Sequence, residues 1–179
     1  MKPIAAIDIT SPCIGWKRVC PDAQRLARCA ARVALTDGIA ETGFTSLTRV
    51  ELAITLTDDA QQQQLNRRYR GEDVSTNVLA FRAWEPGMRT TPGVPLLLGD
   101  VVLALETVAR EANDQVKPFC DHVRHLIVHG VLHLLGYDHR READAIKMER
   151  LETSILAKLG VSDPYRDIQL SNESEPVLT

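Results

Sequence analysis

The stretch HGVLHLLGYDH, residues 129–139, predicts the end of a helix and the turn that follows it. It holds three of the five histidines of the chain, and the other two, His122 and His125, come just before it. On a helix over residues 118–135, at about 100° per residue, the first four histidines fall within about 80° of one another. The other faces of this helix are apolar enough to be buried. One face of a core helix is therefore expected to carry the imidazoles.

The histidines allow more than one metal site. The i,i+4 pairs His125/His129 and His129/His133 can each hold one ion, and the third ligand decides between them. Gly136 can adopt the left-handed conformation that ends a helix, which lets His139 turn back over His133. A site at the earlier pair would lie about 6 Å along the axis and would strain His139. We therefore expect His129, His133 and His139 to be the ligands. The two earlier histidines remain candidates for supporting the site or facing a substrate.

The ligand set predicts catalytic chemistry. Three imidazoles without a fourth protein ligand leave one coordination position open, as in catalytic rather than structural zinc sites. Zinc, or another divalent transition metal, lowers the pKa of a bound water toward about 7. The spacing also frames the signature of metzincin peptidases, in which a Glu after the first histidine is the general base. Gly130 occupies that position here, so peptide hydrolysis by that route is not expected.

The composition is that of one globular domain. The chain has 179 residues, with 44% hydrophobic residues, 25% charged residues and a formal net charge of −3. No apolar run approaches the roughly 18 residues of a membrane span, and the N-terminus lacks the pattern of a signal peptide. The four cysteines show no C-x-x-C spacing, which indicates reduced thiols in a cytoplasmic protein. Cys120 lies beside the histidines, but a buried thiol is favoured over a ligand.

Periodicity predicts four strands and five helices. The strands are expected at residues 5–10, 49–57, 76–81 and within 96–104. The helices are expected at residues 21–38 with Gly38 as the stop, at 60–69 capped by Asp58, from 105 to before 118, at 118–135, and from 140 to the stop at Gly160. The arginines at positions 25, 28 and 32 are read as a solvated face. This order predicts an α+β or mixed α/β layer structure, with one catalytic domain over residues 1–160 and a disordered acidic tail over 161–179.

Three motifs together resemble the YbeY family of bacterial metal-dependent endoribonucleases, which mature ribosomal RNA. The histidine stretch is similar to the family's most specific motif. LNRRYRGEDVSTNVLAF, residues 65–81, and LLGDVVL, residues 97–103, are similar to two weaker ones. The match covers residues 50–160 in the expected order. Ala80 and Arg82 depart from it, because the family often has Ser and Pro there.

The resemblance implies a metzincin-like α+β fold with a small mixed four-stranded sheet and one Zn²⁺ on the three histidine ligands. It implies cleavage of single-stranded RNA, maturation of the 3′ end of 16S ribosomal RNA, and quality control of ribosomes. RNA and the ribosome or its small subunit are the implied partners, without DNA or a membrane. It also assigns a functional role to Arg70.

Independently of the resemblance, the basic residues of the chain suit an RNA substrate. Arginines contact phosphates without regard to sequence, and one of them can offset charge in a phosphoryl transition state. The candidates for RNA binding are Arg67, Arg68, Arg82, Arg140 and Arg141. Asp138, beside a ligand, either orients an imidazole or shapes the turn.

Two other functions remain open. One is a zinc hydrolase of another substrate such as a peptide, with its base supplied from elsewhere. The other is a non-enzymatic ribosome assembly factor whose metal orders the C-terminal helices. Gly130 argues against the first of these, and the open coordination position argues against the second.

Overall fold

The chain folds as one four-stranded mixed sheet with helices packed on it, as the computed structural model of residues 4–40, 42, 49–88, 91 and 93–165 describes. The elements in chain order are β1 (Ile4–Thr10), α1 (Gly15–Val19), α2 (Ala23–Ala40), β2 (Arg49–Thr57), α3 (Asp59–Arg70), β3 (Val78–Arg82), β4 (Leu96–Ala104), α4 (Leu105–Asp114), α5 (Phe119–Leu134) and α6 (Glu142–Lys158). Strands β1, β2 and β4 are parallel, and β3 pairs with β4 in the antiparallel sense. The strand order β1-β2-β4-β3 makes β3 an edge strand. The predicted small mixed sheet is confirmed.

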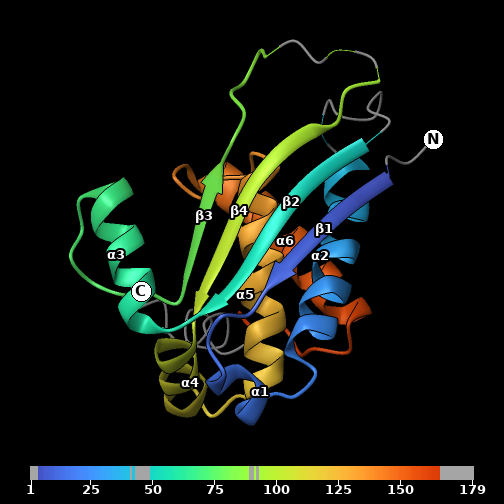
Figure 1. The fold of residues 1–179 in the computed structure, drawn as a ribbon. Helices are drawn as coiled ribbons and strands as arrows, with labels where there is room; N and C mark the ends of the chain where they lie inside the picture. The colour runs from blue at the N-terminus through green and yellow to red at the C-terminus, as the bar shows by residue number, and fades with distance from the viewer. Residues whose placement is uncertain (1–3, 41, 43–48, 89–90, 92, 166–179) are drawn as a thin grey trace, which may run out of the picture.

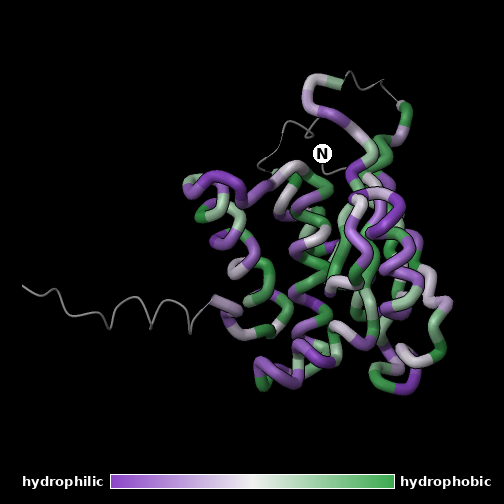
Figure 2. The backbone as a smooth tube through the Cα atoms, turned by 90° about the vertical axis from the view of Figure 1, so that its left-hand side faces the viewer, coloured by the Kyte–Doolittle hydropathy of each residue, from purple (hydrophilic) through white to green (hydrophobic). Residues whose placement is uncertain are grey.

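Alternation along β2 gives the sheet one buried face. Val50, Leu52, Ile54 and Leu56 are each at most 3% exposed, and the register places Ile54 beside Val101 of β4. Helices α2 and α5 pack on this face, and α6 packs in turn on both of them (Figure 1). Apolar segments accordingly gather where the strands meet α5 (Figure 2). The faces of α5 that carry no histidine are thus part of the core.

The prediction that Gly38 ends a helix is wrong, because α2 continues to Ala40. Gly38 instead allows α2 and α5 to approach each other. A Cβ atom at this position would lie 2.5 Å from Leu135 Cδ1 and 3.2 Å from Leu132 Cδ2. The Gly38 carbonyl also accepts a hydrogen bond of 2.9 Å from the Tyr137 hydroxyl. Close helix packing, rather than a chain turn, explains the glycine.

Helix α3 holds the loop that leads into β3. Asp58 caps it as predicted, accepting a hydrogen bond of 2.8 Å from the Gln61 backbone nitrogen. Gln62 is fully buried, where its Nε2 donates to the Val102 carbonyl at 3.1 Å and its Oε1 accepts from the Thr76 backbone nitrogen at 2.8 Å. A buried amide is stable only when it is hydrogen-bonded in this way. These contacts fix the N-terminal part of α3 to β4 and to the loop before β3.

Three further features differ from the prediction or lie at its limits. The short helix α1 was not expected, and its fully buried Trp16 donates a hydrogen bond of 2.7 Å to the Thr57 carbonyl. The chain beyond Gly160 still packs on the domain, since Val161 lies against the core. Residues 166–179, most of the predicted tail, lie outside the described residues.

No helix in the described ranges is long and apolar enough to cross a membrane. All four cysteines are free thiols, and Cys120 Sγ lies 3.0 Å from Cys20 Sγ, not in the histidine site.

Candidate metal centre

Three histidines converge where α5 ends. His129 and His133 lie one turn apart on the helix, and their Nε2 atoms are 3.0 Å from each other. The ring of His139 lies 5.8 Å from that of His129 and 5.0 Å from that of His133, measured between centroids. One ring nitrogen from each of the three lies within 4.8 Å of the other two. The residues expected to be ligands are therefore brought together.

Gly136 makes this convergence possible. Its φ of 97° lies in the left-handed region, which glycine adopts without strain. The turn is closed by hydrogen bonds from the Gly136 nitrogen to the His133 carbonyl at 3.0 Å and from the Tyr137 nitrogen to the Leu132 carbonyl at 3.1 Å. This is the pattern of a helix C-cap with a left-handed residue. It directs the chain back so that His139 faces the last turn of α5.

The hydrogen bonds of the two helical histidines fit a cation. His133 Nδ1 lies 3.0 Å from the Tyr137 carbonyl, and His129 Nδ1 lies 3.2 Å from Glu152 Oε1. Both partners are acceptors, so each neutral ring carries its hydrogen on Nδ1 and presents a lone pair at Nε2. Two lone pairs that face each other at 3.0 Å repel unless a positive charge lies between them. The donor set therefore suits a divalent metal bound through the Nε2 atoms.

Glu152 is the residue of this site that the sequence did not reveal. It lies on α6 with an exposure of 0%, although a lone carboxylate is rarely buried without a partner. The signal in the sequence was its position within the apolar stripe of α6, between Met148 and Ile155, both of which are buried. A charged residue at a core position of a helix calls for a partner. Here the partners are histidines of α5.

Burial and neighbouring charges shift the pKa values at the site. Burial lowers the pKa of His133 to about 4, aided by the nearby His129, which keeps the ring neutral and able to bind a metal. Burial alone would raise the pKa of Glu152, but hydrogen bonds and charge interactions with His125 and His129 outweigh it and lower the pKa to about 2. The buried carboxylate is therefore charged at neutral pH. Its Oε1 lies at ion-pair distance from both rings, 3.2 Å from His129 Nδ1 and 3.4 Å from His125 Nε2.

Gly130, which follows the first ligand, packs against the sheet. A Cβ atom there would lie 2.8 Å from Val101 Cγ1, 3.2 Å from its Cγ2, and 3.4 Å from Val78 Cγ2. The position where metzincin peptidases carry their general base is thus filled by the packing of α5 on β3 and β4. A larger residue would force the ligand helix away from the sheet.

The three histidines line a cleft of about 470 Å³ between α5 and the edge strand β3. Alternate residues of β3 form one wall of this cleft, namely Val78, Ala80 and Arg82. Three of the predicted arginines also line this cleft, namely Arg70, Arg82 and Arg140. Arg70 comes from the C-terminal end of α3, and the Arg82 guanidinium lies 4.8 Å from the Trp84 ring centroid. An anion in the cleft would meet both the three histidines and guanidinium groups.

The remaining candidates lie elsewhere. Arg67, Arg68 and Arg141 are exposed and are not among the residues that line the cleft. Arg67 forms a loose ion pair of 3.9 Å with Asp73. Asp138 lines the cleft, but its contacts are with the His139 backbone nitrogen at 2.8 Å and with Arg140 Nε at 3.2 Å rather than with an imidazole. These contacts favour a role for Asp138 in shaping the turn.

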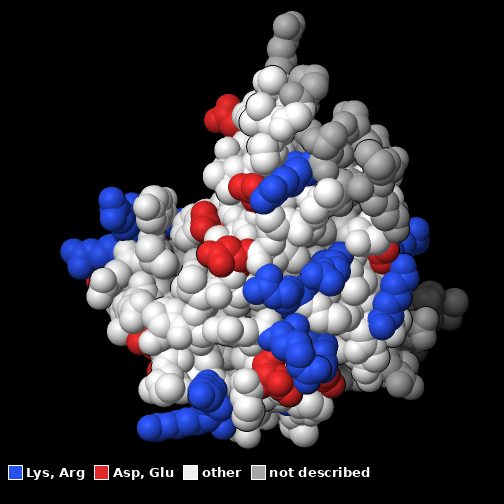
Figure 3. Space-filling view, turned by 45° about the vertical axis from the view of Figure 1, so that its right-hand side comes forward, with Lys and Arg blue, Asp and Glu red and all other residues white. Residues whose placement is uncertain are grey.

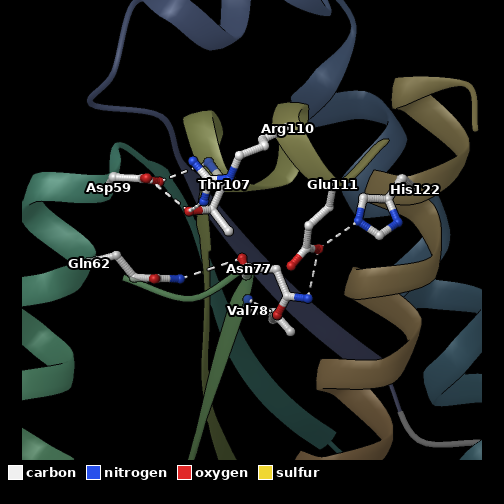
Figure 4. A network of polar contacts seen from close by, with 8 residues as sticks. All are labelled: Asp59, Gln62, Asn77, Val78, Thr107, Arg110, Glu111 and His122. Atoms are coloured by element: carbon white, nitrogen blue, oxygen red, sulfur yellow. Dashed lines mark hydrogen bonds and ion pairs between the residues drawn. The ribbon is translucent and has the colours of Figure 1, made fainter. Parts of the chain in front are cut away.

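His122 lies apart from the cleft in a polar network between α4, α5 and the start of β3 (Figure 4). Its Nε2 lies 2.9 Å from Glu111 Oε2, which also accepts a hydrogen bond of 2.9 Å from Asn77 Nδ2. The Asn77 Oδ1 accepts in turn from the Val78 backbone nitrogen. His122 is 3% exposed, and burial lowers its pKa below the ordinary value. It therefore belongs to the network that holds the start of β3, and it is not among the residues that line the cleft. His125 contacts Glu152 instead, with its Nε2 3.4 Å from Oε1.

Basic side chains also gather away from the cleft. Figure 3 shows a band of lysine and arginine over the side of the molecule on which α2 lies. The exposed arginines of α2 are Arg25, Arg28 and Arg32. Arg25 pairs with Asp22 at 2.8 Å, and Arg28 donates to the Ile7 carbonyl. These partners agree with a solvated face.

Comparison with known proteins points to one family. The family described as Endoribonuclease YbeY matches residues 22–160. A protein of Paramagnetospirillum magneticum named Endoribonuclease YbeY is 51% identical over 89% of this chain and 94% of its own length. One of the same name from Bradyrhizobium sp. is 46% identical over 92% of this chain and 94% of its own. The solution structure of TM1509 from Thermotoga maritima is similar in fold, with a TM-score of 0.50 at 18% identity over 97% of this chain and all of that one.

Proposed function

The chain belongs to the Endoribonuclease YbeY family, and we propose that it is a zinc-dependent endoribonuclease that cleaves single-stranded RNA. Its proposed substrate is precursor ribosomal RNA, cut near the 3′ end of 16S ribosomal RNA, with a further role in ribosome quality control. The ribosome or its small subunit is then its partner, in the cytoplasm. The ribosomal part of this proposal rests on the family resemblance.

One observation carries the chemical part. Three metal-binding imidazoles and three arginines line the same cleft. A phosphodiester is an anion, and cleavage adds negative charge at its oxygens. Arginine offers a planar fork that holds two such oxygens at once. A cleft with both groups suits a phosphodiester better than a neutral peptide bond.

The residues of the cleft divide the work. A bound divalent metal supplies Lewis-acid chemistry at the three histidines. Arg70, at the end of α3, holds the phosphate and offsets the charge that develops in the transition state. Arg82 and Arg140 line the same cleft and contact neighbouring phosphates of the strand. Such contacts are indifferent to base sequence, which suits an enzyme that selects single strands.

The other two functions fit the site less well. A peptidase of the metzincin type needs a carboxylate after the first ligand, and packing against Val101 leaves no room for one at Gly130. A purely structural metal is usually closed by four protein ligands. Among the described residues, the group around His133 contains three.

Cleavage of matched RNAs tests the proposal. Zinc-loaded protein, metal-free protein and an Arg70→Ala variant are given an unstructured RNA, a hairpin RNA and a DNA of the unstructured sequence. We expect only the zinc-loaded wild type to cut the unstructured RNA rapidly, with Arg70→Ala slower by about 10²-fold. Arg70→Lys should recover part of the rate, since lysine keeps the charge without the fork. Arg25→Ala, at an exposed arginine of the solvated face of α2 and outside the cleft lining, is the control and should cut at nearly the wild-type rate.

Two results would overturn the proposal. Equal cleavage by metal-free protein would show that the reaction does not require the metal. A wild-type rate in Arg70→Ala, with metal content and melting temperature unchanged, would show that Arg70 has no role in catalysis. A 16S precursor with an extended 3′ end serves as a third substrate, and failure to shorten it within ribosomal particles would restrict the proposal to general RNA cleavage.

A further inference from the structure

We propose that Glu152 is a positioning residue for the metal ligand His129, and that Tyr165 holds Glu152 in place. The inference rests on the metal centre of the proposed function. It extends that centre from the histidine motif to α6 and to the segment that follows α6.

Glu152 meets its neighbours through both carboxylate oxygens. Its Oε1 lies 3.2 Å from His129 Nδ1 and 3.4 Å from His125 Nε2, and its Oε2 accepts a hydrogen bond from the Tyr165 hydroxyl. The side chain is 0% exposed. A carboxylate buried among apolar residues is strongly destabilising unless it is paired, so the two imidazoles and the hydroxyl around this one buried group indicate a built arrangement.

The contact with His129 decides which nitrogen of that ring can bind a metal. An acceptor beside Nδ1 keeps the ring hydrogen there and leaves the lone pair of Nε2 free. That Nε2 is the atom that lies 3.0 Å from His133 Nε2. His133 is held in the same tautomer by the Tyr137 carbonyl. Glu152 therefore does for the first ligand what a backbone carbonyl does for the second, and its charge also makes the imidazole a stronger donor to a metal.

Tyr165 restrains the carboxylate from the other side. It belongs to a turn in which Asp163 Oδ1 accepts from the Tyr165 backbone nitrogen at 2.9 Å and from the Thr153 hydroxyl at 3.3 Å. This turn ties the segment after α6 to α6 itself. With Oε2 engaged by Tyr165, the carboxylate cannot rotate away from His129 without losing a buried hydrogen bond.

His125, His129 and Glu152 also lie close enough to form a metal-binding group of their own. The contacts of Glu152 with both rings and with the Tyr165 hydroxyl favour the positioning role. A metal on Glu152 and His129 Nδ1 would displace the ring hydrogen and take Oε1 away from both histidines. It would also leave His129 Nε2 without the tautomer that directs it to His133. A second equivalent of bound zinc would indicate that site instead.

Zinc affinity of full-length variants tests the inference. Wild type, Glu152→Gln and Tyr165→Phe are titrated with zinc in competition with a chromophoric chelator. We expect Glu152→Gln to bind one zinc 10–100-fold more weakly, the usual effect of losing such a partner. Tyr165→Phe should weaken binding by a smaller factor. Glu111→Gln is the matched control, because it alters a carboxylate that contacts His122, a histidine of the same helix that is not a ligand.

A spectroscopic signal separates positioning from a general effect on folding. In zinc-loaded wild type, the His129 Nδ1 proton should exchange slowly and appear in a histidine ¹H–¹⁵N spectrum. It should broaden or vanish in Glu152→Gln, while the His133 Nδ1 proton persists. Melting temperatures of the metal-free proteins show whether each variant is folded, and Tyr165→Phe keeps the test open if Glu152→Gln is not.

The outcomes are distinct. Wild-type zinc affinity in both variants, or binding of a second zinc that Glu152→Gln abolishes, would overturn the inference and leave the RNA cleavage proposal standing. Weaker zinc binding in Glu152→Gln, combined with a wild-type protein that cuts no RNA, would support the positioning role and overturn the proposed function.

Discussion

Substitution of Gly130 by alanine tests whether packing, rather than chemistry, keeps a glycine after the first ligand. The added methyl would lie 2.8 Å from Val101 Cγ1 and 3.2 Å from Val101 Cγ2, both closer than ordinary contacts. Rotation of Val101 about its Cα–Cβ bond could turn its hydrogen toward the new methyl, but the χ1 angle of a β-branched side chain is restricted, so this relief is costly. The helix must therefore shift, and over-packing of this kind costs about 1–3 kcal/mol.

Two effects of opposite sign decide the result. Alanine is a better helix former than glycine by about 1 kcal/mol in a helix interior. Two crowded contacts with a stiff side chain place the packing cost in the upper half of its range, so we expect a net loss of about 1–2 kcal/mol. For a protein of this size, that lowers the melting temperature by about 2–8 °C. Urea unfolding of the metal-free protein measures the loss without interference from metal binding.

A double-mutant cycle supplies the control. Val101→Ala removes the two methyl groups that Gly130→Ala meets, so alanine at position 130 should be neutral or stabilising by up to about 1 kcal/mol in that background. The reasoning about packing is refuted if Gly130→Ala alone stabilises the protein. It is also refuted if the effect of Gly130→Ala is the same with valine and with alanine at position 101.

Three further predictions concern the histidines. His133→Ala should lose most of the bound metal in elemental analysis, whereas His125→Ala should keep one equivalent; full occupancy in the first variant would contradict the ligand assignment. Removal of zinc with a chelator should lower the melting temperature of wild type, since a ligand present at 1,000 times its Kd stabilises by about 4 kcal/mol, and should leave His133→Ala unchanged. Burial lowers the pKa of His122, so the folded protein binds this proton less well than the unfolded chain. Its contribution to stability is therefore present above about pH 6.5 and is lost as the pH falls. The free energy of unfolding of metal-free His122→Gln should then decline less between pH 7 and 5 than that of wild type, and parallel curves would contradict the assignment.

Short-range patterns explain what could be predicted from the sequence. Alternation in β2, the Asp58 cap and the glycine after α5 each depend on a few neighbouring residues, and each has the predicted structure. The ligand histidines lie within eleven residues, so helix geometry and one turn were sufficient to bring them together. Gly38 was misread because its role depends on Leu135, almost a hundred residues away in the chain. Glu152 was missed for the same reason, because its role depends on contacts between α6 and the histidines of α5.

The residue after the first ligand marks the physical difference between this site and a metzincin peptidase. Successive residues of a helix point about 100° apart, so a side chain at position 130 cannot share the direction of His129. In this chain that direction leads to Val101 of β4 and Val78 of β3, on the sheet against which α5 packs. A carboxylate there would collide with Val101, since even a Cβ atom would lie 2.8 Å from Val101 Cγ1. Among the described residues that line the cleft, Asp138 is the one carboxylate, and it comes from the turn after α5 rather than from the helix. The turn that Gly136 creates therefore brings both His139 and Asp138 to the cleft.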